Sequence, residues 1–377
     1  MNSATVAVLR VAMLAVLITL SGCGLFAPKE PGIGKPVQWS KLERWSQDDL
    51  ASGWQALLQQ CPRLSSRDQW SVICSAATAL NNPSPTQIRA FIEQRFKPHR
   101  VYGKKGTTDG LITGYYEPLL NGSLQPSERY AYPLYETPPD MLTIELESVY
   151  PSLKGMRLRG RLEGNRIIPF YARGEIDGGS NPLSGNEILW VDDPYGSFFL
   201  QIQGSGRVRL EDGSIVGVNY ANQNGHPYFA IGKTLVEQGE LNLDDVSLFT
   251  IKSWLRDNPE RAEAVLNKNP SYVFFNLRED SDENARGSLN VPLTAGRSLA
   301  VDRNVIPLGT LVWLETTLPD GASYHRLMIA QDTGGAIRGP VRADVFFGAG
   351  ENAEQLAGEM KQQGRMFALL PIDSETR

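Results

Sequence analysis

Short β-type segments, each ended by Gly, Pro or Asn, fill the middle of the chain and limit the folds open to it. They begin at Gly110 and continue to about Val218. Such regular alternation of strands and turn residues is typical of a β-barrel or a β-sandwich. The predicted strands of this all-β unit are Tyr132–Tyr135, Ile167–Ala172, Ile188–Val191, Ser197–Gln203, Gly206–Leu210 and Ser214–Val218.

Apolar residues at helical spacing predict helices before and after this all-β unit. Two short helices are expected around Leu50 and Trp70, the first begun by a capping box of Ser46 and Asp49, and a third begins at Ser84. Helices are also predicted at 231–238, 247–255 and 262–266. The rest is again β-rich, with strands at 272–275, 298–301, 310–315, 326–331, 344–347 and 365–370 and a helix at 352–362.

The length of 377 residues is enough for two domains. The β-rich middle, residues 119–225, is expected to be an insertion. Residues 38–118 together with residues 226–377 would then form the other domain from both ends of the chain. The predicted class is α+β, mainly β with α.

The first 22 residues have the pattern of a signal peptide. Arg10 precedes the apolar run Val11–Leu20, which is too short for a membrane span. The sequence Leu-Ser-Gly-Cys ending at Cys23 resembles the bacterial lipobox, which implies cleavage before Cys23 and lipidation of that residue. The alternative is an ordinary signal peptide followed by an incidental cysteine.

Export has consequences for the rest of the chain. By analogy, Gly24 in place of an aspartate after the cysteine indicates lipid anchoring at the periplasmic face of the outer membrane of a Gram-negative bacterium. Residues 23–37, rich in Pro and Gly, are expected to be a tether. An oxidising compartment favours a disulfide between Cys61 and Cys74, which a helical hairpin would bring together.

Two aspartates flank a glycine-rich turn near the C-terminus. Asp332 ends an apolar run and Asp344 begins another, with Gly334, Gly335 and Gly339 between them. Carboxylates beside such turns are candidates for catalysis, because the turn admits a substrate and apolar neighbours raise a pKa. The alternative is that Asp332 caps a turn and Asp344 only begins a strand.

Aromatic and amide side chains suggest a sugar-binding cleft. Tyr115 and Tyr116 offer flat faces for sugar rings, and Gln201 and Gln203 offer polar groups. If 197–203 is a strand, both glutamines point to the same side and could line one wall. The alternative places the aromatic rings in the core and the glutamines in solvent.

Charge and histidine spacing exclude two classes of protein. The formal net charge of −5, without a cluster of Lys and Arg, argues against nucleic-acid binding. His99, His226 and His325 are far apart in the sequence and have no metal-ligand spacing. We expect neither a metal nor a cofactor.

Several segments in order carry a resemblance to a known family. They are the lipobox, T-G-Y-Y-E-P from Thr113, Q-I-Q-G-S-G-R from Gln201, N-P-S-Y-V-F-F from Asn269, and D-T-G-G-A-I-R-G-P and R-A-D-V-F-F-G around the two aspartates. The chain resembles the MltA family of membrane-bound lytic murein transglycosylases, with a three-aspartate (3D) domain, over about residues 100 to 350. The resemblance implies a double-psi β-barrel, a second β domain that binds substrate, and a glycan-holding groove between them.

The resemblance also implies roles for individual residues. Asp344 would be the single catalytic acid and base, Asp332 a nearby carboxylate that tunes or orients it, and Asp302 a structural residue of the barrel. The partner is then the glycan of peptidoglycan; any partner among proteins of cell-wall synthesis or division is unidentified. Substrate contacts are expected from Thr113, Tyr115, Tyr116, Gln201, Gln203, Gly204 and Ser205.

The chemistry of that family suits one carboxylic acid. Ordinary glycosidases use two carboxylates. A lytic transglycosylase adds no water, because the C6 hydroxyl of the N-acetylmuramic acid attacks C1 and forms a 1,6-anhydro ring. One residue can therefore donate a proton and then accept one, provided that its pKa is raised. For Asp344 we expect this from Val345 to Phe347 and from the charge of Asp332.

Three rival functions follow from the same residues. Asp332-Thr333-Gly334 is the tripeptide of aspartic proteases, but those use two copies and this chain has one. A peptidoglycan-binding lipoprotein without activity is a second alternative, because fold does not imply function. A muramidase that hydrolyses the glycan with water is the third.

Overall fold

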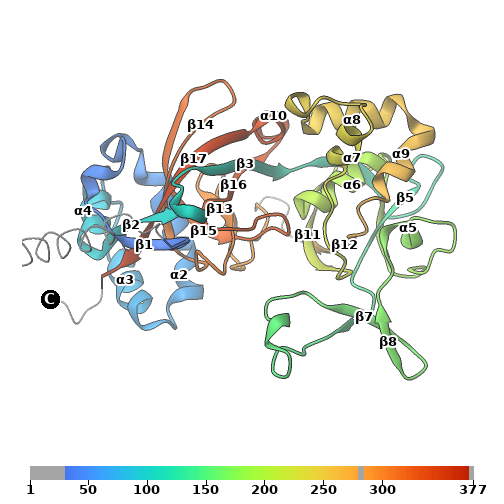
Figure 1. The fold of residues 1–377 in the computed structure, drawn as a ribbon, viewed down its shortest axis with the longest axis horizontal. Coiled ribbons are helices and arrows are strands. Elements are labelled where there is room, and N and C mark those ends of the chain that lie inside the picture. The colour runs from blue at the N-terminus through green and yellow to red at the C-terminus, as the bar shows by residue number, and fades with distance from the viewer. Residues whose placement is uncertain (1–29, 279–283, 373–377) are drawn as a thin grey trace, which may run out of the picture.

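The computed structural model of the protein describes residues 30–278 and 284–372 (Figure 1). The expected signal peptide and Cys23 lie outside these residues. Of the helices in the described part, none is both long and apolar enough to cross a membrane. The chain forms a mixed α+β structure dominated by sheets, which confirms the predicted class.

Six strands close into a ring in one half of the molecule. Their pairing runs β3–β16–β13–β15–β14–β17 and returns to β3. The pairs β13–β15 and β16–β3 are parallel, and the others are antiparallel. The strands are β3 (Gly110–Glu117), β13 (Ser298–Val301), β14 (Leu311–Thr317), β15 (Ser323–Asp332), β16 (Ala343–Ala349) and β17 (Lys361–Pro371).

Alternation along the strands divides the core of this half in two. In β14, Val312 and Leu314 belong to the cluster inside the ring. Leu311 and Trp313 point the other way, into a cluster shared with the N-terminal helices. Because successive side chains of a strand face opposite sides, one strand serves both cores. The helices are α2 (Leu50–Leu64), α3 (Asp68–Thr78) and α4 (Pro85–Arg95), and a disulfide between Cys61 and Cys74 joins the first two.

Two N-terminal expectations are corrected. Gly32–Pro36 form β1, which pairs with β2 (Phe96–Tyr102), so residues 32–36 are not part of the expected tether. Its Gly and Pro content allows an edge strand as well as a linker. The capping box is also wrong: Ser46 lies in a 3-10 turn, and the side chain of Asp49 itself caps α2 by accepting a hydrogen bond from the Ala51 N–H at 3.1 Å.

A second sheet forms the other half, with strand order β12-β11-β10-β4-β9-β5. A three-stranded sheet projects from it (Figure 1), formed by β6 (Leu142–Thr143), β7 (Arg159–Glu163) and β8 (Arg166–Pro169). The strands of the second sheet are β4 (Leu119–Ser123), β5 (Tyr132–Tyr135), β9 (Glu187–Val191), β10 (Ser205–Arg209), β11 (Ile215–Gln223) and β12 (Val273–Arg278).

The predicted boundary at residue 225 is too early. β12 pairs with β11, so this half of the molecule extends to Arg278. The helices between β11 and β12 share a core with α6 (Pro194–Gln203), in which Phe198 and Phe199 pack near Leu235 and Trp254. Helix α10 (Glu351–Glu359) covers β3 and β16 of the ring, whereas the second half contains α5 (Arg173–Ile176), α6 (Pro194–Gln203), α7 (Ile231–Glu237), α8 (Leu248–Asp257) and α9 (Pro259–Leu266).

The predicted strand at 197–203 is a helix, α6. Asp193 caps it by accepting from the Tyr195 N–H at 2.9 Å, and Pro194 occupies the first turn. Gly204 ends it with a φ of 82°, a left-handed conformation that glycine adopts without strain. The apolar run misled the prediction because a helix packed on two sides lacks polar positions at regular intervals.

Candidate active site

Asp332 and Asp344 lie on the two strands that flank β13, each opposite the same residue of that strand. In the ring, Ala300 of β13 is the register partner of Asp332 on β15 and of Asp344 on β16. The topology therefore brings together two carboxylates that end one strand and begin the next. Both face a cavity of about 450 Å³ between the two halves of the molecule.

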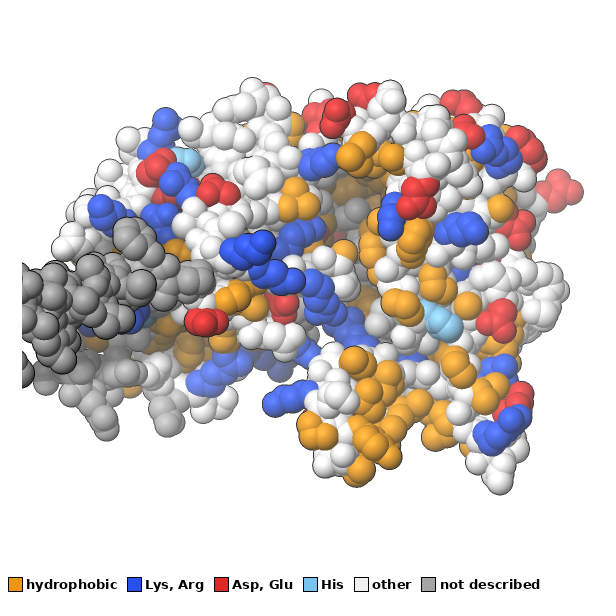
Figure 2. Space-filling view, in the orientation of Figure 1, with side chains coloured by type: hydrophobic (Ala, Val, Ile, Leu, Met, Phe, Trp, Pro, Cys, Tyr) orange, Lys and Arg blue, Asp and Glu red, His pale blue; other side chains and the backbone are white. Residues whose placement is uncertain are grey.

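The cavity contains most of the predicted site residues. Tyr115, Gln201, Gln203, Gly204 and Ser205 line it together with the two aspartates. Figure 2 shows a hollow between the two halves of the molecule. The walls come from the ring on one side and from α6, β10 and β11 on the other.

Asp332 accepts four hydrogen bonds. The N–H and hydroxyl of Ser288 each donate to its Oδ1 at 2.9 Å, and the N–H of Thr333 donates to the same oxygen at 2.8 Å. The Tyr115 hydroxyl donates to Oδ2 at 3.0 Å. Burial raises the pKa of Asp332 above its ordinary value, and these four bonds oppose the rise because they favour the charged form.

Asp344 has fewer partners. The Thr113 hydroxyl donates to its Oδ1, and the Arg342 guanidinium lies 3.8 Å from that oxygen. Burial raises the pKa of Asp344, Arg342 and Thr113 oppose the rise, and the charge of Asp332 adds to it. Its side chain keeps 19% of its surface exposed, so a substrate can reach it.

The apolar surroundings of Asp344 differ in part from the expectation. Phe346 shares its side of β16 and packs with Tyr115 at a ring distance of 5.2 Å. Val345 points into the ring, and Phe347 packs against the same cluster, away from the carboxylate. Alternation along the strand therefore leaves one of the three neighbours on the same side as the carboxylate.

Tyr115 and Tyr116 are neighbours in β3 and therefore face opposite sides of the strand. Tyr115 lines the cavity, but Tyr116 is buried on the other face, where its hydroxyl donates to Glu354 at 2.9 Å. Tyr116 is therefore not a wall of the cavity, contrary to the expectation. Thr113 is placed against Asp344 and is absent from the cavity lining.

The glutamines line the cavity from the end of a helix. The Gln201 Oε1 accepts from Arg173 at 2.7 Å and from the Val273 N–H at 3.3 Å. The Gln203 Oε1 accepts from the Tyr116 N–H at 3.1 Å, which joins the two halves of the molecule. The amide oxygens of both glutamines therefore accept hydrogen bonds from other groups of the protein.

Asp302 has the geometry of a turn residue. Its Oδ1 accepts from the Asn304 N–H at 3.1 Å, and its Oδ2 accepts from the Gly339 N–H at 2.9 Å. It joins the loop after β13 to the glycine-rich segment behind Asp332. No group of three or more His, Cys, Asp and Glu side chains in the described residues is arranged to hold a metal.

Three site residues were missed from the sequence. Arg342 is two positions before Asp344, so strand alternation alone would have placed both on one side. Ser288 gives no local signal, because it meets Asp332 across 44 residues. Arg173 is 2% exposed and lies over the rings of Phe198 and Tyr272.

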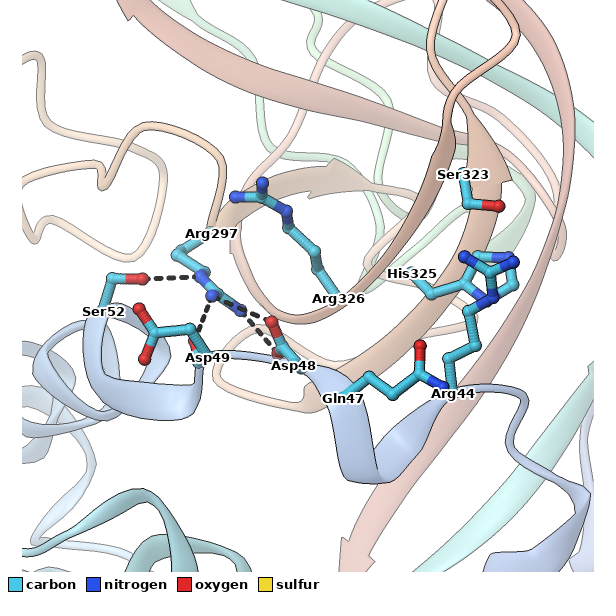
Figure 3. A pocket seen from close by; sticks show the side chains of 9 residues that line it. All are labelled: Arg44, Gln47, Asp48, Asp49, Ser52, Arg297, Ser323, His325 and Arg326. Carbon is cyan, nitrogen blue, oxygen red and sulfur yellow. Dashed lines mark hydrogen bonds and ion pairs between the residues drawn. The ribbon is translucent and has the colours of Figure 1, made fainter.

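A second pocket, of about 320 Å³, lies beside the start of α2 (Figure 3). Its central group is Arg297, which is buried and donates to both oxygens of Asp48, at 2.7 and 3.0 Å. It also donates to Ser52 at 2.8 Å and to the Asp49 carbonyl. These bonds attach the N-terminal helices to the ring, so the cluster is structural.

Comparison with known proteins supports the resemblance. Residues 111–276 match the MltA specific insert domain and residues 297–370 match the 3D domain. Membrane-bound lytic murein transglycosylase A of Escherichia coli K12 is 34% identical over 267 residues, which cover 68% of this chain and 65% of that protein.

Solved structures are similar over almost the whole described chain. A membrane-bound lytic murein transglycosylase from Agrobacterium tumefaciens is 32% identical, with a TM-score of 0.80, covering 90% of this chain and 98% of that one. Escherichia coli MltA with bound chitohexaose is 25% identical, with a TM-score of 0.67, covering 92% of this chain and 97% of that one. The chain therefore belongs to the MltA family, with a 3D domain in its C-terminal part.

Proposed function

We propose that the protein is a peptidoglycan lytic transglycosylase. It would cleave the β-1,4 bond from N-acetylmuramic acid to N-acetylglucosamine without water and leave a 1,6-anhydro end. The observation that carries the proposal is the pair Asp332 and Asp344, which face the cavity from the two sides of Ala300 and differ in their hydrogen bonds. The relatives named as lytic murein transglycosylases, one of them with bound chitohexaose, support a glycan as the ligand.

Differences in hydrogen bonding support a different role for each aspartate. Four donors stabilise the anion of Asp332, whereas Asp344 has the Thr113 hydroxyl and a more distant guanidinium. The charge of Asp332 in turn favours a proton on Asp344. Asp344 is then the acid and Asp332 the fixed anion, as in other sites where two carboxyl environments separate the roles.

Two proton transfers complete the reaction. The Asp344 carboxyl gives its proton to the glycosidic oxygen, the bond from C1 to that oxygen breaks, and N-acetylglucosamine leaves with a C4 hydroxyl. The C6 hydroxyl of the muramic acid then attacks C1 and gives its proton to the Asp344 carboxylate, which restores the acid. The positive charge that develops at C1 is eased by the substrate's acetamido group or by Asp332.

The same contacts weigh against the rivals. A water-using muramidase needs a second carboxylate as base or nucleophile. Both oxygens of Asp332 already accept hydrogen bonds, and one of them accepts three. A non-catalytic binding protein would have no need for a buried pair of this kind, because burying carboxylates costs free energy.

Finer features of the family belong to this proposal. The closed ring of six strands would be the double-psi β-barrel, with the β-rich half inserted to bind the glycan. Cys23 would carry the lipid that holds the protein at the periplasmic face of the outer membrane. Asp302 would serve the barrel by fixing the glycine-rich segment.

Product analysis tests the function. Protein without residues 1–23 is incubated with peptidoglycan sacculi, and the released fragments are weighed. Anhydro-muropeptides, lighter by one water than hydrolysis products, are expected. Fragments with reducing ends would instead identify a muramidase, and binding without release would identify a non-catalytic protein.

A further inference from the structure

Arginines outnumber carboxylates in the lining of the cavity. The chain as a whole has a formal net charge of −5, yet four arginines accompany the two aspartates there. Figure 2 shows Lys and Arg side chains gathered along the border of the hollow, whereas most acidic side chains of that view lie at the outer margins. A cleft with this distribution attracts an anion. The arginines are Arg157, Arg173, Arg286 and Arg303.

Only part of this charge is neutralised within the protein. Arg173 is buried and lies 3.4 Å from the Asp177 carboxylate. Arg157 and Arg303, by contrast, form no ion pair with any carboxylate in the described part of the chain. These two are the candidates for contact with an anionic ligand.

Arg157 and Arg303 come from opposite walls of the cavity. Arg303 follows the end of β13, three positions after Ala300, and lines the cavity from the ring, as do the two aspartates. Arg157 precedes β7 of the projecting sheet. Its guanidinium donates to the Tyr220 hydroxyl at 3.2 Å, and Tyr220 also lines the cavity. A strand lying in the cleft would thus pass between two guanidinium groups.

We propose that Arg157 and Arg303 form an anion-binding subsite for the carboxylates of the peptide stems carried by the glycan. This inference rests on the proposed function, which supplies the glycan. A guanidinium offers a planar set of donors that matches a carboxylate. In peptidoglycan the lactyl groups are joined by amide bonds to peptides, and these peptides have free carboxylates, whereas chitin-type glycans are uncharged. The two arginines also offset the repulsion between anionic stems and Asp332.

A binding comparison in an inactive background tests the subsite. Soluble peptide-bearing glycan chains are titrated against the Asp344→Asn protein, and so are the same chains after an amidase has hydrolysed the amide bond to the peptide. The treated chains lose the carboxylates of the stem and keep one lactyl carboxylate per muramic acid, so an uncharged chitin oligosaccharide serves as the reference without any carboxylate. We expect the peptide-bearing chains to bind about tenfold more tightly at low salt. Arg157→Gln and Arg303→Gln should each reduce this preference about threefold, and added salt should weaken it because partly exposed charges are screened.

Matched variants separate charge from folding. Arg157→Lys and Arg303→Lys keep the charge and should retain most of the preference. Arg209→Gln removes an exposed arginine outside the cavity lining and should leave the preference intact. Equal unfolding temperatures of the Gln and Lys variants confirm that the fold is preserved.

The binding test of the subsite and the product test of the proposed function can fail independently of each other. Equal binding of the two kinds of chain, or a preference unchanged in both Gln variants, would overturn the subsite even if anhydro products are released. A preference that falls in the Gln variants supports the subsite even if the wild-type protein releases no anhydro products, in which case only the proposed function fails.

Discussion

Ser288 donates two hydrogen bonds to a single oxygen of Asp332, one from its N–H and one from its hydroxyl, both at 2.9 Å. The segment 284–296 is thereby attached to the end of β15. Donors aimed at one oxygen stabilise the anion of a carboxylate. This contact makes Asp332 and Asp344 unequal although both are buried beside the same residue of β13.

Ser288→Ala removes the hydroxyl donor and keeps the N–H. The pKa of Asp332 should rise, because its anion loses one hydrogen bond. If Asp332 acts as an anion, activity is lost below its pKa, so the acidic limb of kcat/KM against pH should move to higher pH. We expect a fall of about fivefold at neutral pH. Ser253→Ala, at an exposed serine on α8, is the control; an acidic limb that stays in place would argue against the anionic role.

Arg342→Gln removes the cation nearest to Asp344. The guanidinium lowers the pKa of this carboxyl, so its loss should raise that pKa further. In the proposed mechanism Asp344 acts in its protonated form, so activity is expected to fall as pH rises through its pKa. The alkaline limb of the pH profile should therefore move to higher pH. Arg209→Gln is the control and should leave both limbs of the pH profile unchanged. A shift of the alkaline limb to lower pH in Arg342→Gln would contradict the role of Asp344 as the acid.

The two aspartates should respond differently to amidation. Asp344→Asn removes the proposed proton donor and should reduce release of anhydro-muropeptides at least about 100-fold, with binding to sacculi retained. Asp332→Asn keeps the shape but loses the charge, and the rate should fall less. Initial rates of release measure both. An equal or larger loss in Asp332→Asn would mean that the two roles are reversed.

The strands around the site were predictable because local pattern and tertiary structure agree there. Strand Ser298–Val301 has the predicted bounds, since it is an apolar run buried on both sides and ends at turn residues. The resemblance singled out Asp332 and Asp344, and the register opposite Ala300 explains their proximity.

Other parts depend on contacts that no local pattern contains. Helix α6 has the apolar content of a buried strand and is distinguished by its cap at Asp193 and its end at Gly204. β12 joins the second sheet although three α-helices separate it from β11, so the boundary at residue 225 was placed too early. Ser288 and Arg297 act on residues more than 40 positions away.

Arg297 and Asp48 provide a prediction about stability that is independent of catalysis. The two side chains are 2% and 4% exposed and form a bidentate ion pair, and Asp48 also accepts from the Leu327 N–H at 2.9 Å. Breaking a buried pair leaves the remaining charge without compensation. Arg297→Met should therefore reduce the free energy of unfolding by about 3 kcal/mol, and Asp48→Leu by a similar amount.

The double variant distinguishes a buried charge from a lost contact. With both charges removed, neither is left unpaired, so Arg297→Met with Asp48→Leu should be destabilised less than the sum of the single variants by about 2 kcal/mol. Urea unfolding followed by circular dichroism gives the three values. Strictly additive losses would mean that each side chain acts through its other bonds, to Ser52 for Arg297 and to Leu327 for Asp48. Because this cluster joins α2 to β15, the variants should also release the N-terminal helices from the ring before the ring itself unfolds.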